Sequence, residues 1–405
     1  MLYGNAVVGQ SGGPTAAINA TLAGVIRGAI ASEAVETLYG MRHGVEGLLK
    51  EELVDLTRLF AREEDISLLE DTPAAALGSC RYRLPDPKAD AAPYHRLFEI
   101  FKKYNIRYFF YIGGNDSMDT VAKLTAYMKD VDYEMRLIGI PKTIDNDLVG
   151  TDHTPGFGSA AKYIATTMKE ILLDCAVYTT TAVTIVEIMG RDAGWLTAAS
   201  ALPLLSGEGP DLIYLPERPF DIPSFLASVK SAFERHPNVV VAVSEGLRLA
   251  DGTYLSKSAQ TEGTDAFGHQ QLSGTGRFLE HVVKREFGCK VRSVELSLAQ
   301  RCAAHISSAT DIEESVRTGK AAVEAALEGR SGHMMVAVRE EGDYAIRISS
   351  VPVSEIANKV KTVPNEYINE TGDGITEAGL RYLVPLIIGE RARVFENGMP
   401  KHFKI

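Results

Sequence analysis

The fold can be worked outward from one stretch of the sequence, Ile138-Gly-Ile-Pro-Lys-Thr-Ile-Asp-Asn-Asp147. Leu137, Ile138 and Ile140 form a short apolar run that predicts a buried strand. Pro141 ends that strand because proline has no backbone N–H to donate to a neighbouring strand. The polar residues that follow are therefore expected at the carboxyl end of a strand, which is where open α/β sheets bind their ligands.

These polar residues carry a set of groups that suits proton abstraction beside a phosphate. Asp145 and Asp147 are two positions apart and would face the same way if the backbone stays extended. Lys142 and Thr143 add an ammonium and a hydroxyl next to them. Taken alone, the stretch also fits a solvated turn in which Asp and Asn side chains satisfy backbone groups.

The same pattern of strand, polar turn and helix recurs along the chain. Strands are expected over residues 6–8, 108–112, 137–140, 180–188 and 239–243, with a shorter one over 336–338. The first five run into turns that contain glycine or proline with polar residues, over 9–15, 113–117, 141–147, 189–194 and 244–246. Helices are expected over 16–30, 93–104, 118–129, from after 161 to about 175, 195–201 and 313–327. This alternation predicts α/β architecture with largely parallel sheets.

Two of these turns resemble phosphate sites without matching a nucleotide motif. Backbone N–H groups at a glycine turn and the start of a helix can bind a phosphate, as residues 9–15 and 113–117 allow. Neither turn has the GxxxxGK[ST] or GxGxxG spacing. Close packing explains a Gly-Gly pair equally well, and Asp116 or Ser117 suits a simple N-cap.

Length and composition indicate a globular protein of two lobes that binds anions locally. The chain has 405 residues, of which 45% are hydrophobic and 23% charged, and its formal net charge is −11. Such a charge argues against non-specific binding of nucleic acid. Candidate cations for a local anion site are Arg81, in a loop expected over 78–83, with Arg292 and Arg301. Each of them in isolation would be read as a surface charge.

The sequence also argues against export and against a disulfide or metal framework. The N-terminus has no signal-peptide pattern and no apolar stretch is long enough to span a bilayer, so a cytoplasmic protein without membrane attachment is expected. The four cysteines are scattered and show no CxxC spacing.

Taken together and in order, the motifs closely resemble the phosphofructokinase family. They are Ser11-Gly-Gly13, Gly113-Gly-Asn-Asp-Ser117, Pro141-Lys-Thr-Ile-Asp-Asn-Asp147, Met189-Gly-Arg191, Ser244-Glu-Gly246 and Gln300-Arg301. The resemblance extends from about residue 4 to at least residue 310. It implies two Rossmann-like lobes with the active site in the cleft between them. The larger, donor-binding lobe would comprise 1–158 plus about 300–370, and the smaller, sugar-phosphate-binding lobe 159–299 plus about 371–405.

Within the family, the resemblance is to the pyrophosphate-dependent branch. Asp116 and Lys142 stand where the ATP-using branch has glycines. The implied glycolytic reaction is reversible transfer from pyrophosphate to the 1-hydroxyl of fructose 6-phosphate, with Mg²⁺. Alternatives are an ATP-dependent kinase, sedoheptulose 7-phosphate as the acceptor, or a catalytically silent regulatory subunit.

The resemblance also implies a role for individual residues. Asp145 would be the base, beside Thr143 and Asp147, and Lys142 and Asp116 would act in catalysis and at the pyrophosphate. The other implied pyrophosphate ligands are Gly12 and Arg81. The implied sugar-phosphate ligands are Thr143, Asp145, Met189, Gly190, Arg191, Glu245 and Arg301, with Arg292 reaching the neighbouring subunit's sugar phosphate in a homodimer or homotetramer.

The chain departs from the family pattern at three positions. Asn115 stands where most relatives have a metal-binding Asp, so Asn115 and Asp147 are both candidate Mg²⁺ ligands. Ala182 stands where many members have a second arginine that crosses the subunit interface. Leu298 replaces a histidine before the Gln-Arg pair, which leaves open whether His305 takes its place.

Overall fold

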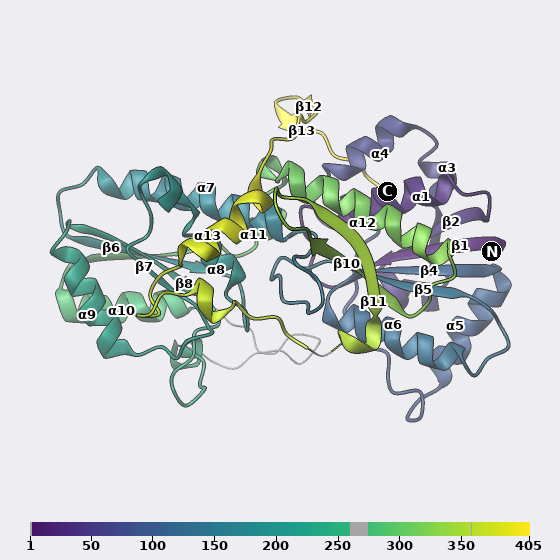
Figure 1. The fold of residues 1–405 in the computed structure, drawn as a ribbon, viewed down its shortest axis with the longest axis horizontal. Coiled ribbons are helices and arrows are strands. Elements are labelled where there is room, and N and C mark those ends of the chain that lie inside the picture. The colour runs from purple at the N-terminus through teal and green to yellow at the C-terminus, as the bar shows by residue number, and fades with distance from the viewer. Residues whose placement is uncertain (1, 260–273, 358) are drawn as a thin grey trace.

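The computed structural model describes residues 2–259, 274–357 and 359–405, which form two α/β lobes side by side (Figure 1). The expected α/β architecture with largely parallel sheets is confirmed. The exact limits of the two lobes along the chain stay a prediction. In the part of the chain that the structure describes, no helix combines the length and the apolar character needed to cross a membrane.

The larger sheet has seven strands in the order β11-β10-β5-β4-β1-β2-β3. Their bounds are Gly4–Gln10 (β1), Val35–Met41 (β2), Leu53–Asp55 (β3), Ile106–Gly113 (β4), Arg136–Pro141 (β5), His333–Arg339 (β10) and Ile346–Pro352 (β11). The pairs from β10 to β2 are parallel, whereas β3 and β11 run antiparallel at the two edges. The sheet therefore brings the carboxyl ends of β1, β4 and β5 to one side.

Helices cover both faces of this sheet because its central strands are apolar on both sides. In β4, Tyr108 and Phe110 face α1 (Ile18–Ile30) and α12 (Ala309–Leu327). Phe109 and Tyr111 point the other way, towards α5 (Ala92–Lys103) and α6 (Asn115–Met128). This alternation is the period of two that a strand imposes on its side chains. Figure 1 shows α1 and α12 along one face of the sheet and α5 and α6 along the other.

The smaller sheet has four parallel strands in the order β7-β8-β6-β9. Their bounds are Leu212–Tyr214 (β7), Asn238–Ser244 (β8), Ala182–Ile188 (β6) and Lys290–Glu295 (β9). One face packs on α7 (Phe157–Ala176) and α8 (Trp195–Ala199), and the other on α9 (Ile222–Phe233) and α10 (Thr275–Phe287). The carboxyl ends of β6 and β8 therefore lie together, as those of β1, β4 and β5 do in the larger sheet.

Shorter elements occur in the rest of the described residues. They are α2 (Gly44–Leu49), α3 (Leu56–Leu59), α4 (Glu63–Glu70), α11 (Ala299–Cys302), α13 (Glu377–Leu383), β12 (Phe395–Glu396), β13 (Met399–Pro400) and six short 3₁₀ segments. The last residues return to the larger sheet's side, where the Phe403 ring lies 4.7 Å from that of Phe60.

Two local expectations are corrected by the structure. Helix α6 begins at Asn115, directly after Gly114, so Asp116 and Ser117 lie in its first turn and neither is its N-cap. The stretch after β5 does not stay extended, because Asn146 has a left-handed backbone with φ of 52°. Asparagine tolerates that conformation better than most residues.

Candidate active site

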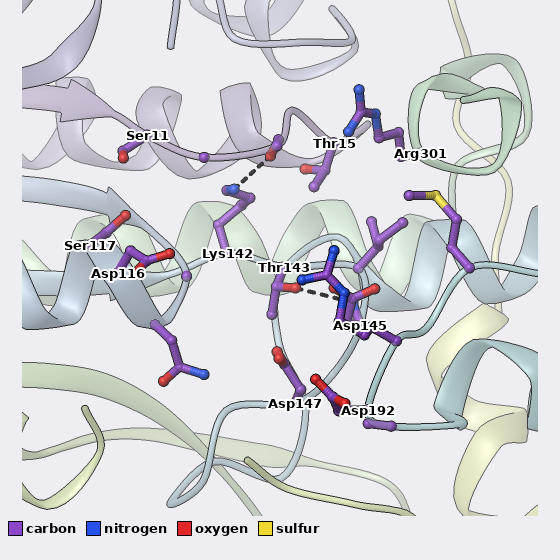
Figure 2. Close-up of a pocket in the computed structure, with 18 of the residues that line it drawn as sticks. Ser11, Thr15, Asp116, Ser117, Lys142, Thr143, Asp145, Asp147, Asp192 and Arg301 are labelled. Atoms are coloured by element: carbon purple, nitrogen blue, oxygen red, sulfur yellow. Dashed lines mark hydrogen bonds between the residues drawn. The ribbon is translucent and has the colours of Figure 1, made fainter. Parts of the chain in front are cut away.

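The polar ends of five strands meet in a cleft between the two sheets, with a volume of about 460 Å³. The larger sheet supplies residues after β1, β4 and β5, and the smaller sheet supplies residues after β6 and β8. Figure 2 shows Lys142, Asp145 and Asp147 from the larger sheet with Asp192 from the smaller one. The cleft is lined by Ser11, Gly12, Gly13, Pro14, Thr15, Arg81, Arg83, Gly114, Asn115, Asp116, Ser117, Lys142, Thr143, Ile144, Asp145, Asp147, Met189, Arg191, Asp192, Ala193, Glu245, Arg301 and Val360.

Lys142 lies at the floor of the cleft against the glycine turn that follows β1. Its Nζ donates a hydrogen bond of 2.6 Å to the Gly13 carbonyl, and only 3% of the residue is exposed. A Cβ on Gly12 would lie 3.3 Å from that Nζ, so a larger residue would crowd the ammonium. Burial lowers the pKa of Lys142 to about 8, against the opposing charge of Asp145. The ammonium is therefore held where an anion entering the cleft would meet it.

Three carboxyl groups of the cleft have raised pKa values. Burial raises the pKa of Asp145, although the charges of Lys142 and Arg191 oppose the shift. Burial and the charge of Asp145 raise the pKa of Asp147 to about 7 and that of Glu245 to about 8. Asp147 and Glu245 can therefore hold a proton near neutral pH. The upward shift of the Asp145 pKa makes that carboxylate a better proton acceptor, as a general base must be.

The turn that carries Asp145 and Asp147 is built so that both line the cleft. Asn146, between them, is fully buried and points away from it. Its Nδ2 donates to the Tyr382 hydroxyl at 2.9 Å, and its Oδ1 accepts from Lys361 Nζ at 3.0 Å. The backbone N–H of Asp145 donates to Thr143 Oγ1 at 3.1 Å. The two aspartates thus share a cleft through a left-handed turn instead of an extended strand.

The glycine turn after β1 is tied to the loop that carries Arg81. The Gly12 N–H donates to the Cys80 carbonyl at 3.2 Å, and Ser79 Oγ donates to the Gly12 carbonyl at 2.6 Å. This loop brings the exposed Arg81 to the cleft, as the sequence suggests. The Gly12 N–H already has a protein partner in this structure, so its expected contact with pyrophosphate stays a prediction.

Asp116 stands at the edge of the cleft with a partner that the sequence did not reveal. Its Oδ1 forms an ion pair of 2.7 Å with Arg83 Nη2. Arg83 comes from the loop of Arg81, two residues further on, and both side chains line the cleft. No local pattern in the sequence points from Arg83 to Asp116, because the two residues are 33 positions apart.

On the side of the smaller sheet, the turns after β6 and β8 are joined to each other. Glu245 Oε1 accepts from the Gly190 N–H at 3.2 Å, and Ser244 Oγ donates to the Gly190 carbonyl at 2.7 Å. A Cβ on Gly246 would lie 1.8 Å from the Arg191 carbonyl oxygen, so this approach needs glycine. Met189, Arg191 and Glu245 all line the cleft. Gly190 does not line it, but its backbone N–H donates to the Glu245 carboxylate.

The two arginines expected from the second half of the chain lie in different places. Arg301, on α11, lines the cleft beside Gly13, where an added Cβ would lie 3.3 Å from its Nη1. Arg292 is exposed on β9 and lies outside the cleft, lining a separate hollow with Cys175 and Thr184. The geometry of one chain therefore does not bring Arg292 to the other candidates, and its expected role across a subunit interface stays a prediction.

Of the three positions that depart from the family pattern, Asn115 lines the cleft, whereas Ala182 and Leu298 do not. Leu298 is 58% exposed just before α11, and His305 is exposed. Ala182 is the first residue of β6. Neither His305 nor Leu298 lines the cleft, so His305 does not stand in for a histidine at position 298 in this structure.

Several cleft residues had not been singled out from the sequence. Ser11, Thr15 and Ser117 lie in turns that were expected to bind phosphate, and Asp192 follows Arg191 directly. Their place in those turns was the available signal. Val360 carries no such signal, because it lies in a segment well beyond the last motif, Gln300-Arg301.

Asn115 and Asp147, the two candidate Mg²⁺ ligands, both line the cleft. Asn115 Oδ1 is buried and has no hydrogen-bond partner among the described residues, while its Nδ2 donates to the Lys359 carbonyl at 3.2 Å. No cluster of three or more His, Cys, Asp or Glu residues suited to a metal occurs in the described ranges. Mg²⁺ usually takes one or two protein oxygens together with substrate phosphates, so a cage of protein ligands is not required.

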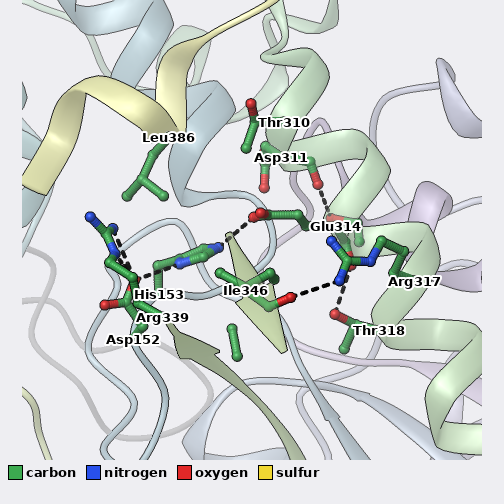
Figure 3. A network of polar contacts seen from close by, with 12 residues as sticks. Asp152, His153, Thr310, Asp311, Glu314, Arg317, Thr318, Arg339, Ile346 and Leu386 are labelled. Atoms are coloured by element: carbon green, nitrogen blue, oxygen red, sulfur yellow. Dashed lines mark hydrogen bonds and ion pairs between the residues drawn. The ribbon is translucent and has the colours of Figure 1, made fainter. Parts of the chain in front are cut away.

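A second group of polar residues lies outside the cleft lining, and its members are paired with one another (Figure 3). His153 Nδ1 lies 2.8 Å from Asp152 Oδ2, and its Nε2 lies 2.7 Å from Glu314 Oε2. Arg339 donates to the same Asp152 oxygen at 3.0 and 3.1 Å, and Tyr344 donates to Glu314 at 2.9 Å. We call Asp152, His153, Glu314, Arg339 and Tyr344 the buried network.

Comparison with known proteins gives one consistent result. The family model described as Phosphofructokinase matches residues 5–326. Two curated proteins named pyrophosphate--fructose 6-phosphate 1-phosphotransferase are similar over 100% of this chain and 97% of their own length, at 42% identity for Halomonas elongata and 43% for Xanthomonas campestris. The crystal structure of a pyrophosphate-dependent phosphofructokinase from Nitrosospira multiformis superposes with a TM-score of 0.88 at 38% identity, covering 99% of this chain and 96% of that one.

Proposed function

Because this chain belongs to the phosphofructokinase family, we propose that it transfers a phosphoryl group reversibly from pyrophosphate to the 1-hydroxyl of fructose 6-phosphate. The observation that carries the proposal is the pair Lys142 and Asp116, which line one cleft with the carboxylate Asp145. Relatives that carry the pyrophosphate-dependent name at about 40% identity over their full length support the same reading. The product on the sugar side is fructose 1,6-bisphosphate, as in glycolysis.

Asp145 is the general base of this reaction. Its carboxylate takes the proton of the sugar 1-hydroxyl as that oxygen forms a bond to one phosphorus of pyrophosphate and the bridging P–O bond breaks, releasing phosphate. The raised pKa of Asp145 suits it to receive a proton, and Thr143 and Asn146 hold its turn in place. In the reverse direction the same group returns the proton.

Cations of the cleft supply most of the remaining catalysis. Phosphoryl transfer gives the protein little covalent work, so the rate depends on aligning the two ligands and neutralising charge. Lys142 faces the pyrophosphate from the floor of the cleft and Arg81 from the rim, next to the Gly12 turn. Asp116 occupies space that the α-phosphate of ATP would need, and its negative charge repels that phosphate.

The smaller sheet holds the sugar phosphate. Arg191 and Arg301 bind its phosphate oxygens in pairs, as guanidinium groups do. Glu245 accepts hydrogen bonds from sugar hydroxyls, while Gly190 fixes that carboxylate and Met189 packs against the sugar. This division places the donor on one wall of the cleft and the acceptor on the other.

Mg²⁺, when bound through Asn115 and Asp147, would neutralise donor oxygens. We therefore expect activity to disappear in excess chelator and to return when Mg²⁺ is added in excess. Undiminished activity with chelator present would remove the metal from the proposal. Partial recovery with Mn²⁺ but none with Ca²⁺ is the expected control, because Ca²⁺ prefers a larger coordination shell.

A coupled assay of the purified protein tests the proposed function. Fructose 1,6-bisphosphate is measured with fructose 6-phosphate, Mg²⁺ and either pyrophosphate or ATP. Turnover with pyrophosphate and not with ATP supports the proposal, and the opposite result favours an ATP-dependent kinase. A parallel series with sedoheptulose 7-phosphate tests the acceptor, and the absence of turnover with every pair would identify a silent subunit. We also propose that the protein is a homodimer or homotetramer, and light scattering of the pure protein tests that oligomeric state. A cytoplasmic location is a further part of the proposal.

A further inference from the structure

Residues 359–363 form a strap that contacts residues of both lobes. On the side of the larger sheet, the Lys361 N–H donates to the Asp147 carbonyl at 2.7 Å and Asn115 Nδ2 donates to the Lys359 carbonyl. On the side of the smaller sheet, Trp195 Nε1 donates to the Lys361 carbonyl at 3.0 Å. Val363 then joins the core of the smaller sheet. The strap therefore ties the turn of the catalytic base to the opposite lobe.

The side chain of Lys361 adds a second and stronger tie. Its Nζ donates to Asn146 Oδ1 at 3.0 Å, to the Thr151 carbonyl at 3.2 Å and to the Asp152 carbonyl at 2.7 Å. These three acceptors account for the three N–H donors of an ammonium group. They also lie at both ends of the loop 146–152, so one cation closes that loop. The Trp195 ring lies 5.1 Å away and packs over the same group.

Asn146 is the point through which this cation reaches the site. It is fully buried, has a left-handed backbone and lies between the two aspartates of the cleft. Lys361 holds its oxygen while Tyr382 holds its nitrogen, which fixes the direction of the side chain. Without these two contacts the Asn146 side chain would lose the hydrogen bonds that fix it, and the backbone of the turn that carries Asp145 would be less constrained. Misplacing a catalytic group by about 1 Å costs on the order of 10²-fold in rate.

We propose that Lys361 is a positioning residue that holds the loop 146–152, through Asn146, so that Asp145 meets the sugar hydroxyl. This inference rests on the proposed function, because it takes Asp145 as the base. Lys361 itself does not line the cleft.

The competing explanation is that Lys361 contributes only to stability. The chain contains a matched control, Lys162, whose Nζ also donates to a backbone carbonyl, that of Gly389, at 2.6 Å, and to Glu390. Lys162 is 7% exposed and lies on α7, outside the cleft lining. Lys162→Met is therefore expected to lower thermal stability with kcat unchanged.

Steady-state kinetics of Lys361→Met, Asn146→Gly and the double variant test the proposal. Glycine at position 146 accepts the left-handed backbone and removes the side chain that Lys361 holds. Each single change should lower kcat on the order of 10²-fold with little change in KM for either ligand. The double variant should lose no more than the larger single loss, because both changes break one connection.

Independent losses that multiply in the double variant would overturn the proposal, as would wild-type kcat in either single variant. Asn146→Gly keeps the ammonium and its two carbonyl partners, so it decides the question even if Lys361→Met does not fold. An equal loss of kcat in Lys162→Met would also overturn it, because stability alone would then explain the effect.

Amide hydrogen exchange separates this inference from the proposed function. Peptides covering residues 143–152 should exchange faster in Lys361→Met and in Asn146→Gly than in the wild type, and at the wild-type rate in Lys162→Met. If the wild type failed to use pyrophosphate and fructose 6-phosphate, the proposed function would fall while exchange still decided whether Lys361 fixes the loop. Unchanged exchange in both variants would overturn the inference in an active enzyme.

Discussion

Asp147 and Asp152 are five residues apart and both partly buried, yet the protein shifts their pKa values in opposite directions. Burial and the charge of Asp145 raise the pKa of Asp147 to about 7. Burial would also raise that of Asp152, but the hydrogen bond from His153 and the charges of His153 and Arg339 outweigh it and lower the pKa. Asp147 is thus shifted by burial and a neighbouring carboxyl group, whereas Asp152 is held by His153 and Arg339.

The opposite pKa shifts indicate that Asp147 serves the reaction and Asp152 serves stability, although both lie in one short loop. The cleft keeps carboxyl groups close together at a cost in stability, and bound ligands and Mg²⁺ are expected to relieve that cost. The buried network satisfies its charges within the chain, so its loss should act on folding. Changes in the cleft should therefore alter rate more than stability, and changes in the network should do the reverse.

The largest expected effect on rate is that of Asp145→Asn, which keeps the size of the side chain and removes the base. General-base catalysis contributes on the order of 10²- to 10⁴-fold, so kcat should fall by about that much while sugar binding survives. The melting temperature should hold or rise, since one of two repelling carboxylates is gone. Near-normal turnover would exclude Asp145 as the base.

Lys142→Met should come next, because it removes a cation aimed at the pyrophosphate. Losing one such stabilising group typically costs about 10²- to 10³-fold in kcat. The KM for fructose 6-phosphate should change little, since Lys142 contacts the Gly13 turn on the donor wall. If the sugar KM rose in proportion instead, Lys142 would have to be reassigned to the acceptor.

His153→Gln should act on the other side of the comparison, on stability. Breaking a buried charged pair costs about 3–5 kcal/mol, and kcat of the folded enzyme should stay near that of the wild type. Asp152 and Glu314 flank the imidazole, and Arg339, Tyr344 and Asp311 lie around them. A greater effect on kcat than on stability would show that the network takes part in catalysis.

The pH dependence of that stability follows from His153. Burial alone would lower its pKa, but Asp152 and Glu314 outweigh burial and raise it above the usual 6.5. A raised pKa adds stability that is complete below the unfolded value and is lost as pH rises through the folded value. The stability difference between wild type and His153→Gln should therefore be largest in mild acid and shrink in alkaline solution. Urea unfolding across pH measures it, and a difference that grows with pH would contradict the assignment.

The smallest expected effect concerns the choice of donor. Asp116→Gly removes a carboxylate from the mouth of the cleft and leaves Arg83 without its ion pair. Relieving about 1.4 kcal/mol of repulsion would raise the rate with ATP about tenfold, with a smaller change for pyrophosphate. Combining it with Lys142→Gly should shift the preference further towards ATP. Equal losses with both donors in each variant would mean that neither residue discriminates between them.

The sequence by itself determined the strands, their polar ends and most residues of the cleft. Apolar runs such as 108–112 and 137–140 mark buried strands, and parallel strands bring their carboxyl ends to one edge whatever the details of packing. The candidates after β1, β4, β5, β6 and β8 therefore lie in one cleft, apart from Gly190, which lies just behind it. Strands β2 and β9 and helices α9 and α10 were not predicted from the sequence, because they do not follow the pattern of strand, polar turn and helix that marks the predicted units.

Tertiary structure alone decided the conformation of the catalytic turn and the contacts that cross the fold. The left-handed backbone of Asn146 depends on Tyr382 and Lys361, which lie more than 200 residues away in sequence. Arg83 finds Asp116, and Arg292 stays outside the cleft, only because of how loops and edge strands pack. Local patterns of residues report which backbone a segment prefers and which face it buries. They hold no information on which distant side chain will form a hydrogen bond with a buried amide, because the tertiary packing of the chain decides that partner.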